Sequence, residues 1–490
     1  MGKETGIRAR VSRAGGRSAL ACALVVPLLA ACGGGSGSSG TTLKIWDYSA
    51  EQTDFHKKVA EEFHRQHPGI TVQWQSIAQD EYKRTLPLAF QSHQGPDIFY
   101  WSDNGPLAMS QLMGQKWIQP LNGGAALPAT FTKRWPKGSF TEGVNQLGGK
   151  TYGFPLSEST YWGPGYMFLN KKVFKDAGLA TTNPPKTWSD LKSTCARIKE
   201  RTKAYCIASP TKDVDLQRVF YALAAGEYTT NDLFFDYKKG TFSLSEPQAQ
   251  KVFSFIQELK KDGYLAPGNN DKNFSRQQFA AGQAGIMMDG TWLPSVLKTL
   301  GLGSSGYTVA AHPVPDSGSK GSLWSQPDGN KYWVSADSKQ SKAAWTFLNW
   351  MTQPDGYFAR QYLAGGFGTL AFADNKRYIK DPAIQQIMRI ADEPAFRVKL
   401  PLPVAKCPDL VRSTAYVKAI GQRPTWEYEA MSGALNSGKS LGPEAERIVG
   451  QRQKTLTSEL KKEAAKGLKV SMDCFTFPDW SYTTDYRPAE

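Results

Sequence analysis

A strand–helix–strand unit that begins near residue 43 constrains the fold of this chain more than any other feature. Residues 43–46 (LKIW) are expected to form a short strand, and residues 70–74 alternate between apolar and polar side chains, which is typical of a half-buried strand. Between them lie apolar residues at helical spacing, namely Phe55, Val59, Ala60 and Phe63. The helix is expected to stop at Pro68 and Gly69. A helix that links two strands in this way predicts an α/β domain with a largely parallel sheet.

The next segments extend this sheet and suggest where a ligand binds. Residues 80–91 are expected to form a helix, although Pro87 should kink it or delay its start. Residues 97–101 form a short apolar strand that opens into a polar loop containing Asp103 and Asn104. Because α/β folds bind ligands at the carboxyl ends of their strands, both residues are candidate ligand contacts.

The first 40 residues have the features of an export signal. Four arginines precede an almost uncharged run over residues 18–31, which is too short to span a bilayer as a permanent helix. Cys32 follows two alanines and precedes a flexible Gly/Ser linker. This arrangement resembles the lipobox of bacterial lipoproteins, which implies cleavage before Cys32 and attachment of a lipid to it. We therefore expect a signal peptide at 1–31, a linker at 32–42 and an extracytoplasmic, membrane-anchored body; secretion after cleavage near Ala31 is the alternative.

The charge distribution and the histidines argue against nucleic-acid-binding and metal-dependent functions. The formal net charge is +15, but lysines and arginines are scattered among acidic residues and no nucleic-acid motif is present, so no nucleic-acid partner is expected. The five histidines include His64 and His67 at a helix end, and no HExxH motif occurs, so no metal or cofactor is expected. Aromatic residues make up 12% of the chain, which suits a protein that stacks rings against its ligand.

Four cysteines remain for disulfides once the signal and the lipid site are set aside: Cys195, Cys206, Cys407 and Cys474. An even number in an oxidising compartment favours two disulfides. Local pairing, Cys195 with Cys206 and Cys407 with Cys474, is the simplest of three connectivities. The other two connectivities and four buried free thiols stay open as alternatives.

Six motifs in order resemble those of the extracellular solute-binding proteins of carbohydrate ABC transporters, the maltose-binding-protein type. They lie at residues 43–46, 63–70, 95–98, 148–174, 185–191 and 279–292. The segment PKTWSDL at 185–191, for example, resembles the family's PKTWxEL with Asp190 in place of Glu. Two departures stand out: Leu169 replaces the family's tyrosine, and an unusual ring-rich stretch occupies residues 161–166. The cleft is therefore expected to differ in shape from that of well-studied relatives.

The resemblance implies a two-lobed, type II periplasmic-binding-protein fold, in which two α/β lobes are joined by hinge strands and close on a ligand. It places the N-terminal lobe at 43–154 and 313–353 and the C-terminal lobe at 155–312 and 354–490. It implies a sugar or oligosaccharide ligand, ABC permease subunits as partners, and no enzymatic activity. The implied ligand-binding residues are Trp46, Asp47, Trp101, Asp103, Asn104, Glu158, Trp292 and Trp426. Trp46 and Trp101 could instead belong to the core.

Two other functions stay open at this stage. An extracellular glycoside-active enzyme would use a pair of carboxylates about 5–10 Å apart, such as Asp47 or Asp103 with Glu158, but no hydrolase motif accompanies them. A surface receptor or adhesin could share the fold without serving a transporter. Permease genes beside the gene of this chain would favour transport.

Overall fold

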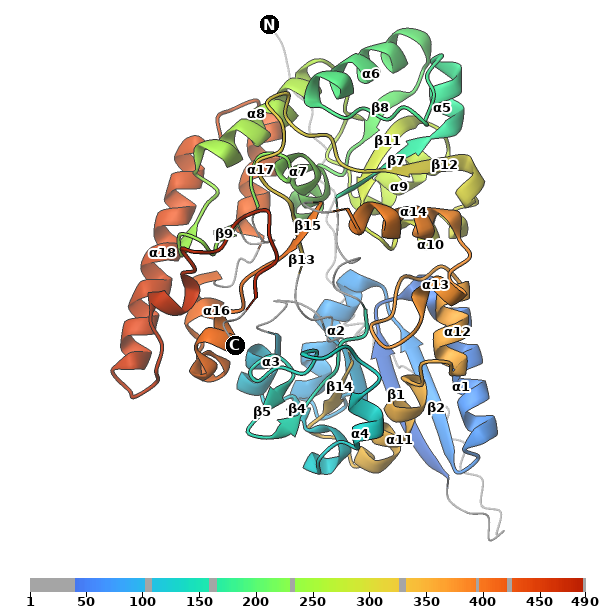
Figure 1. The fold of residues 1–490 in the computed structure, drawn as a ribbon, viewed down its shortest axis with the longest axis vertical. Coiled ribbons are helices and arrows are strands. Elements are labelled where there is room, and N and C mark those ends of the chain that lie inside the picture. Colours follow the sequence, from blue (N-terminus) through green and yellow to red (C-terminus); the bar gives the residue numbers. More distant parts are fainter. Residues whose placement is uncertain are drawn as a thin grey trace, which may run out of the picture. The chain divides into compact units, whose positions relative to one another are not determined.

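The computed structural model describes residues 40–101, 108–157, 165–229, 234–325, 332–393, 396–420 and 425–487. Two main β-sheets organise these residues, each with helices packed against it (Figure 1). The expected α/β fold is therefore confirmed. Within the described segments, the structure has no helix that is both long and apolar enough to cross a membrane.

The first sheet has the strand order β2-β1-β3-β14-β4. Its strands are β1 (Thr41–Asp47), β2 (Ile70–Ser76), β3 (Ile98–Tyr100), β4 (Ile118–Gln119) and β14 (Tyr332–Ser335). β1 pairs in parallel with β2 and β3, while β14 is antiparallel to β3 and β4. Helix α1 (Thr53–Gln66) buries Phe55, Val59 and Phe63, so the predicted strand–helix–strand unit is confirmed.

Further helices cover the first sheet. They are α2 (Gln79–Gln91), α3 (Ala108–Gly114), α4 (Ala129–Thr132), α11 (Ser341–Met351), α12 (Tyr357–Ala364) and α13 (Asn375–Tyr378). Of the two effects predicted for Pro87, a kink or a delayed start, the delayed start is wrong, because α2 begins at Gln79 and continues through Pro87. Its buried face, which includes Tyr82, Leu86 and Phe90, holds the helix together despite the missing amide donor.

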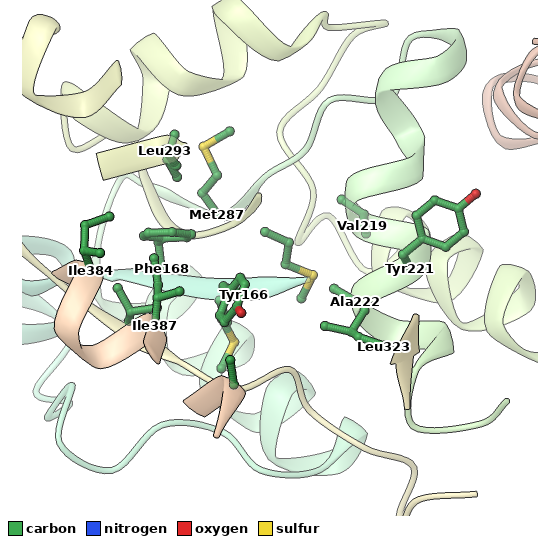
Figure 2. Close-up of a cluster of buried hydrophobic side chains, with 14 of the residues drawn as sticks. Tyr166, Phe168, Val219, Tyr221, Ala222, Met287, Leu293, Leu323, Ile384 and Ile387 are labelled. Atoms are coloured by element: carbon green, nitrogen blue, oxygen red, sulfur yellow. The ribbon is translucent and has the colours of Figure 1, made fainter. Parts of the chain in front are cut away.

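The second sheet has the strand order β12-β7-β11-β8. Its strands are β7 (Tyr166–Asn170), β8 (Tyr205–Ala208), β11 (Ala284–Asp289) and β12 (Tyr307–Ala310). Every residue of β7 and β11 is buried, as expected for central strands covered on both faces. The surrounding helices include α5 (Lys171–Asp176), α6 (Trp188–Arg201), α7 (Gln217–Ala224), α8 (Pro247–Lys261), α9 (Lys272–Ala280), α10 (Leu293–Thr299) and α14 (Pro382–Ala391). Figure 2 shows Phe168 and Tyr166 of β7 among the apolar side chains of α7 and α14.

Strand pairing brings particular residues of the second sheet to one edge. In the antiparallel pair of β7 and β11, Tyr166 lies opposite Asp289, and β12 ends with Ala310 opposite Met167. The carboxyl ends of β11 and β12 therefore meet the start of β7. Beyond this edge, β13 (Leu323–Ser325) pairs in parallel with β15 (Arg397–Lys399). Gly165, at φ 112°, lets Leu323 come so close that a Cβ at Gly165 would lie 2.4 Å from the leucine side chain.

The chain connects the two sheets more than once, as expected for hinge strands. It passes from β6 (Lys150–Thr151) beside the first sheet to β7, and it returns from β12 through β13 to β14. The lobe boundaries stay a prediction. The rings of Phe55 in α1 and Phe358 in α12 lie 5.3 Å apart, which favours moving α12 from the C-terminal to the N-terminal lobe.

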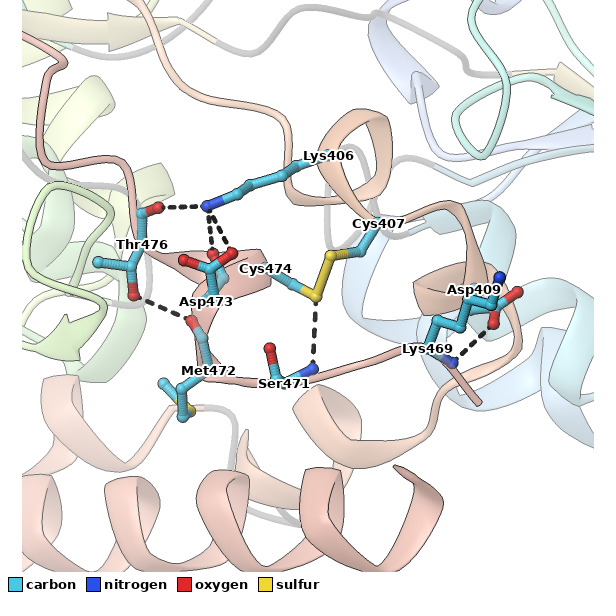
Figure 3. The surroundings of a disulfide bond; sticks show 9 residues. All are labelled: Lys406, Cys407, Asp409, Lys469, Ser471, Met472, Asp473, Cys474 and Thr476. Atoms are coloured by element: carbon cyan, nitrogen blue, oxygen red, sulfur yellow. Dashed lines mark hydrogen bonds and ion pairs between the residues drawn. A yellow bond between two sulfur atoms is a disulfide. The ribbon is translucent and has the colours of Figure 1, made fainter. Parts of the chain in front are cut away.

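Much of the C-terminal region belongs to a separate apolar cluster, to which α15 (Pro403–Lys406), α16 (Ala415–Ile420) and α18 (Gly442–Ala464) contribute. In contrast, α17 (Trp426–Ser437) packs into the main core through Tyr428, Met431 and Leu435. Figure 3 shows how the Cys407–Cys474 disulfide and Lys406 fasten the tail after α18. The Lys406 ammonium bonds to the backbone oxygens of Asp473 at 2.7 Å and Thr476 at 2.9 Å.

The second disulfide joins Cys195 of α6 to Cys206 of β8, so the structure has the predicted local pairing at both positions. Helix α6 begins with a capping box, in which Thr187 and Asp190 satisfy each other's backbone amides. The remaining short elements are η1 (Ala50–Gln52), η3 (Leu121–Gly124), β5 (Gln146–Leu147), η5 (Asp213–Leu216), β9 (Phe235–Asp236), β10 (Thr241–Phe242), η6 (Ser304–Gly306), η7 (Pro408–Arg412) and η8 (Met472–Phe475).

Candidate functional site

Asp47 ends strand β1 and is fully buried. The indole nitrogen of Trp74 donates to its carboxylate at 3.0 Å, and the backbone amide of Ser49 donates at 3.2 Å. Burial outweighs these donors and raises the pKa of Asp47 to about 6. With its oxygens occupied inside the protein, Asp47 is better suited to fixing the end of β1 than to contacting a ligand.

Aromatic side chains surround the carboxyl ends of β1 and β3. The rings of Tyr48 and Tyr100 lie 4.5 Å apart in an edge-to-face contact, and the Tyr82 hydroxyl donates to the Tyr100 carbonyl oxygen at 2.7 Å. Trp46 is half-buried, whereas Trp101 is only 8% exposed. Of the two predicted tryptophans, Trp46 is therefore the one that retains a surface for stacking.

Glu51 lies in the short helix η1 directly after β1. The surrounding protein desolvates its carboxylate and raises its pKa, although the residue keeps solvent access. A side chain that faces a concave surface has both properties. The carboxylate of Glu51 also interacts electrostatically with Arg276 of α9, which lies beside the second sheet.

The opposite side of the site centres on Asp289, the fully buried last residue of β11. Its carboxylate pairs with the guanidinium nitrogen Nε of Arg218 at 3.0 Å and with that of Arg276 at 2.8 Å. Burial opposes ionisation of Asp289, but the two arginines outweigh it and lower its pKa. Arg218 also pairs with Asp215 at 2.8 Å, so a continuous network of ionic groups lines this sheet edge.

Lys272 connects this network to the first sheet. Its backbone amide donates to Asp215 at 2.9 Å, which holds the start of α9 against the network. Its ammonium donates to the side-chain oxygen of Gln79, the first residue of α2, at 2.6 Å. Burial lowers the pKa of Lys272, and its side chain is 17% exposed. Helices that flank different sheets thus make direct polar contact at the site.

Trp292 lies in the same region. It is half-buried and forms the N-cap of α10, which neighbours η1 of the first sheet. Its ring lies against Gly290, where an added Cβ would be 2.3 Å from a ring carbon. The glycine therefore permits the ring position, and Trp292 stays a predicted stacking residue between the two sheets.

Trp426, another of the predicted ligand-binding residues, lies beside an arginine of α18. Trp426 begins α17, and the guanidinium carbon of Arg447 in α18 lies 4.5 Å from the centre of its indole ring. This contact favours a role in packing α17 against α18 over ligand stacking. Four other predicted residues, Cys32, Asp103, Asn104 and Glu158, lie outside the described residues.

Sequence reasoning missed the charged residues of the site. These are Glu51, Arg218, Lys272 and Arg276, together with the polar residue Gln79. Arg218 carried a usable signal, because this charged residue directly precedes the apolar run VFYALA in the same helix. Lys272 and Arg276 lie four residues apart on one helix, which places them on the same face. Nothing in the local sequence links Gln79 to Lys272.

The described residues include no group of three or more His, Cys, Asp or Glu side chains arranged to hold a metal ion. The ionic groups that meet here instead form pairs with one another, and the half-buried rings lie beside them. Such a site can hold a solute by hydrogen bonds and ring contacts.

Two connected sheets whose polar edges meet define the class of two-lobed α/β binding proteins. The GacH receptor of Streptomyces glaucescens GLA.O has a similar structure, with a TM-score of 0.63 and 19% identity over 85% of this chain and 98% of that one. The family model described as "Bacterial extracellular solute-binding protein" matches residues 47–357. This chain belongs to that family.

Curated relatives agree with the assignment. A binding protein of Brucella abortus (strain 2308) is 26% identical over 321 residues, which cover 64% of this chain and 72% of the relative. The maltotriose-binding protein of Pyrococcus abyssi (strain GE5 / Orsay) is 24% identical over 330 residues, covering 66% of this chain and 64% of the relative. The family is one of solute-binding proteins and not of enzymes, which agrees with the prediction of no enzymatic activity.

Proposed function

We propose that this chain is the solute-binding lipoprotein of an ABC importer, which captures a sugar or oligosaccharide outside the membrane. The observation that carries the proposal is the contact between Lys272 and Gln79, because it brings helices of the two sheets together beside the candidate site. A solute bound between the helices of the two sheets would contact both lobes. It would therefore favour the arrangement in which the lobes are closed on it. Closure then presents the loaded protein to the permease subunits.

The side chains at the site suit a carbohydrate. Trp46 and Trp292 are half-buried and can offer ring faces to the C–H surface of a sugar. Glu51 and Arg276 supply charged hydrogen-bonding groups from opposite walls, which suit hydroxyl groups. The names of similar proteins support this ligand class, since one relative is a maltotriose-binding protein and the GacH receptor was solved with acarbose.

A panel of neutral sugars and oligosaccharides tests the ligand class. Thermal shift and calorimetry should find at least one saccharide that raises the melting temperature and is recovered unchanged. Small-angle scattering with that saccharide should show a smaller radius of gyration. Failure of every saccharide to bind would contradict the proposal, and turnover of the sugar would favour the glycoside-active alternative.

The lipid anchor on Cys32 is part of the same proposal and has its own test. Cys32→Ser should leave the protein without its lipid and release it from the membrane fraction of its bacterial host. Replacement of a neighbouring linker residue, Ser36→Ala, serves as the control and should leave the protein bound. If the Cys32 variant stays on the membrane, the anchor is wrong while solute binding is unaffected.

A further inference from the structure

Three buried polar side chains lie together just beyond the Asp289 edge of the second sheet: Tyr166, His312 and Arg397. Tyr166 starts β7 opposite Asp289, and His312 follows the end of β12 by two residues. Arg397 is the first residue of β15. Their exposed fractions are 0%, 7% and 8%, so all three side chains are inside the protein.

Contacts with Phe396 and between the group's own members hold it together. The ring of His312 stacks on Phe396 with centroids 5.0 Å apart, and the ring of Tyr166 lies 5.3 Å from the same phenylalanine. The guanidinium carbon of Arg397 lies 5.9 Å from the centre of the Tyr166 ring. One apolar ring thus sits among three side chains that can all donate hydrogen bonds.

The polar atoms of this group are largely unsatisfied. The Tyr166 hydroxyl, both ring nitrogens of His312, and Nε and Nη1 of Arg397 make no hydrogen bond of normal geometry to a described residue. The Tyr166 hydroxyl and the Arg397 guanidinium interact electrostatically with each other. Of the guanidinium nitrogens of Arg397, only Nη2 makes a hydrogen bond of normal geometry, which it donates to the Trp324 carbonyl oxygen at 3.1 Å. Buried donors without acceptors are costly, and a buried cation without a counter-charge is more so.

The nearby carboxylates do not neutralise Arg397. Asp289 is already shared between Arg218 and Arg276, and Asp215 pairs with Arg218. Asp392 acts electrostatically on Tyr166, but Arg397 forms no ion pair with a carboxylate of the described residues. The described part of this sheet edge therefore carries more positive than negative charge.

We infer that Tyr166, His312 and Arg397 form a binding site for an oxyanion. A guanidinium with two nitrogens that make no hydrogen bond of normal geometry, beside a phenol and an imidazole, matches the several oxygens of a carboxylate, sulfate or phosphate. Because the group adjoins the Asp289 edge, the oxyanion that best fits the proposed function is the carboxylate of an acidic saccharide. The assignment of the oxyanion to a saccharide rests on the proposed saccharide-binding function. The alternative source of the oxyanion is a free inorganic anion.

The test compares an acidic oligosaccharide containing a hexuronate with the neutral oligosaccharide of the same length, and also uses sulfate alone. Calorimetry with the full-length protein should show tighter binding of the acidic saccharide. Arg397→Gln should weaken that binding about 10- to 100-fold and leave the neutral saccharide unaffected, since only the charged hydrogen bonds are lost.

Two further variants distinguish a loss of ligand binding from a loss of folding. Tyr166→Phe removes one hydroxyl and should give a smaller loss with the same selectivity for the acidic ligand. Arg134→Gln is the matched control: this part-buried arginine donates to the Asn349 carbonyl oxygen at 2.8 Å, beside α11, and its loss should not change the preference.

The outcomes separate the inference from the proposed function. Equal binding of both saccharides, unchanged by Arg397→Gln, would overturn the oxyanion site while the saccharide function stands. Binding of sulfate that is lost in Arg397→Gln, with no saccharide bound, would support the oxyanion site with an inorganic source and contradict the saccharide function. Absence of binding by every probe would overturn both.

Discussion

The ammonium group of Lys272 lies 2.6 Å from the side-chain oxygen of Gln79, although the two residues are 193 positions apart in the chain. Lys272 starts α9 beside the second sheet, and Gln79 starts α2 beside the first. The bond therefore joins helices that flank different sheets. In the proposed mechanism, in which two lobes close on a solute, a bond of this kind favours the closed arrangement.

Removal of this bond should weaken solute binding through the closure equilibrium. For Gln79→Leu we expect a loss of about 1 kcal/mol, or about fivefold in affinity, because one charged hydrogen bond to a partly exposed lysine is lost. Lys272→Met also removes the 3.9 Å ion pair with Asp215 and should lose at least as much, and the double variant should lose no more than Lys272→Met. Calorimetry with the identified saccharide measures all three, and additive losses would contradict a direct bond.

Trp292→Ala should reduce affinity and leave the fold intact. The loss of a half-buried stacking ring should cost about 1–3 kcal/mol, which is roughly 5- to 150-fold in affinity. Gly290→Ala should act in the same direction, because the added methyl group would push the ring from its place. Trp426→Ala is the matched control at α17. A large fall in melting temperature with unchanged affinity would move Trp292 from the site to the core.

Asp47 should make stability depend on pH in a direction opposite to that of an aspartate whose pKa is lowered in the folded state. Its pKa is about 6 in the folded protein against 3.8 for an unperturbed group, so the folded state holds the proton longer. Stability from this group is complete below pH 3.8 and is lost as pH rises to about 6, at about 1.4 kcal/mol per pH unit. Urea unfolding of the protein and of Asp47→Asn between pH 4 and 7 isolates the effect. A constant difference between the two would contradict it.

The two disulfides should contribute unequally to stability. Cys407 and Cys474 are 67 residues apart, whereas Cys195 and Cys206 are 11 apart. Loop entropy predicts that removing the longer link with Cys407→Ser and Cys474→Ser costs about 4 kcal/mol, against about 3 kcal/mol for the shorter one. Thermal unfolding of the two double-serine variants compares them directly. Equal stabilities would contradict the entropic argument, and free thiols in the exported protein would contradict the disulfides themselves.

Much of the fold could be predicted because the signals were local. The spacing of Phe55, Val59 and Phe63 specifies a helix that is buried on one face, and Thr187 with Asp190 forms a capping box within four residues. The disulfides followed from nearest-neighbour pairing. In contrast, periodicity could not predict that α2 would continue through Pro87, because packing of Tyr82 and Leu86 decides that.

The site could be predicted only in part. The sequence located strand ends, which is why Trp46, Asp47 and Trp292 were predicted, but it could not distinguish a buried Asp47 from an accessible Glu51 four residues later. That distinction depends on Trp74, which reaches Asp47 from the neighbouring strand. The cationic residues beside the second sheet, Arg218, Lys272 and Arg276, gave weaker sequence signals, since a charged residue on a helix is ordinarily exposed.

The sequence by itself determined the helices, the strands and their apolar faces, since these depend on side chains a few positions apart. Only the tertiary structure decided which charges are neutralised. Asp289 meets Arg218 from 71 positions away, whereas Arg397 remains without a carboxylate among the described residues. The physical reason is that the free energy of a buried charge is set by the groups within a few ångströms of it. In this chain, strand register and the crossing between sheets bring those groups together.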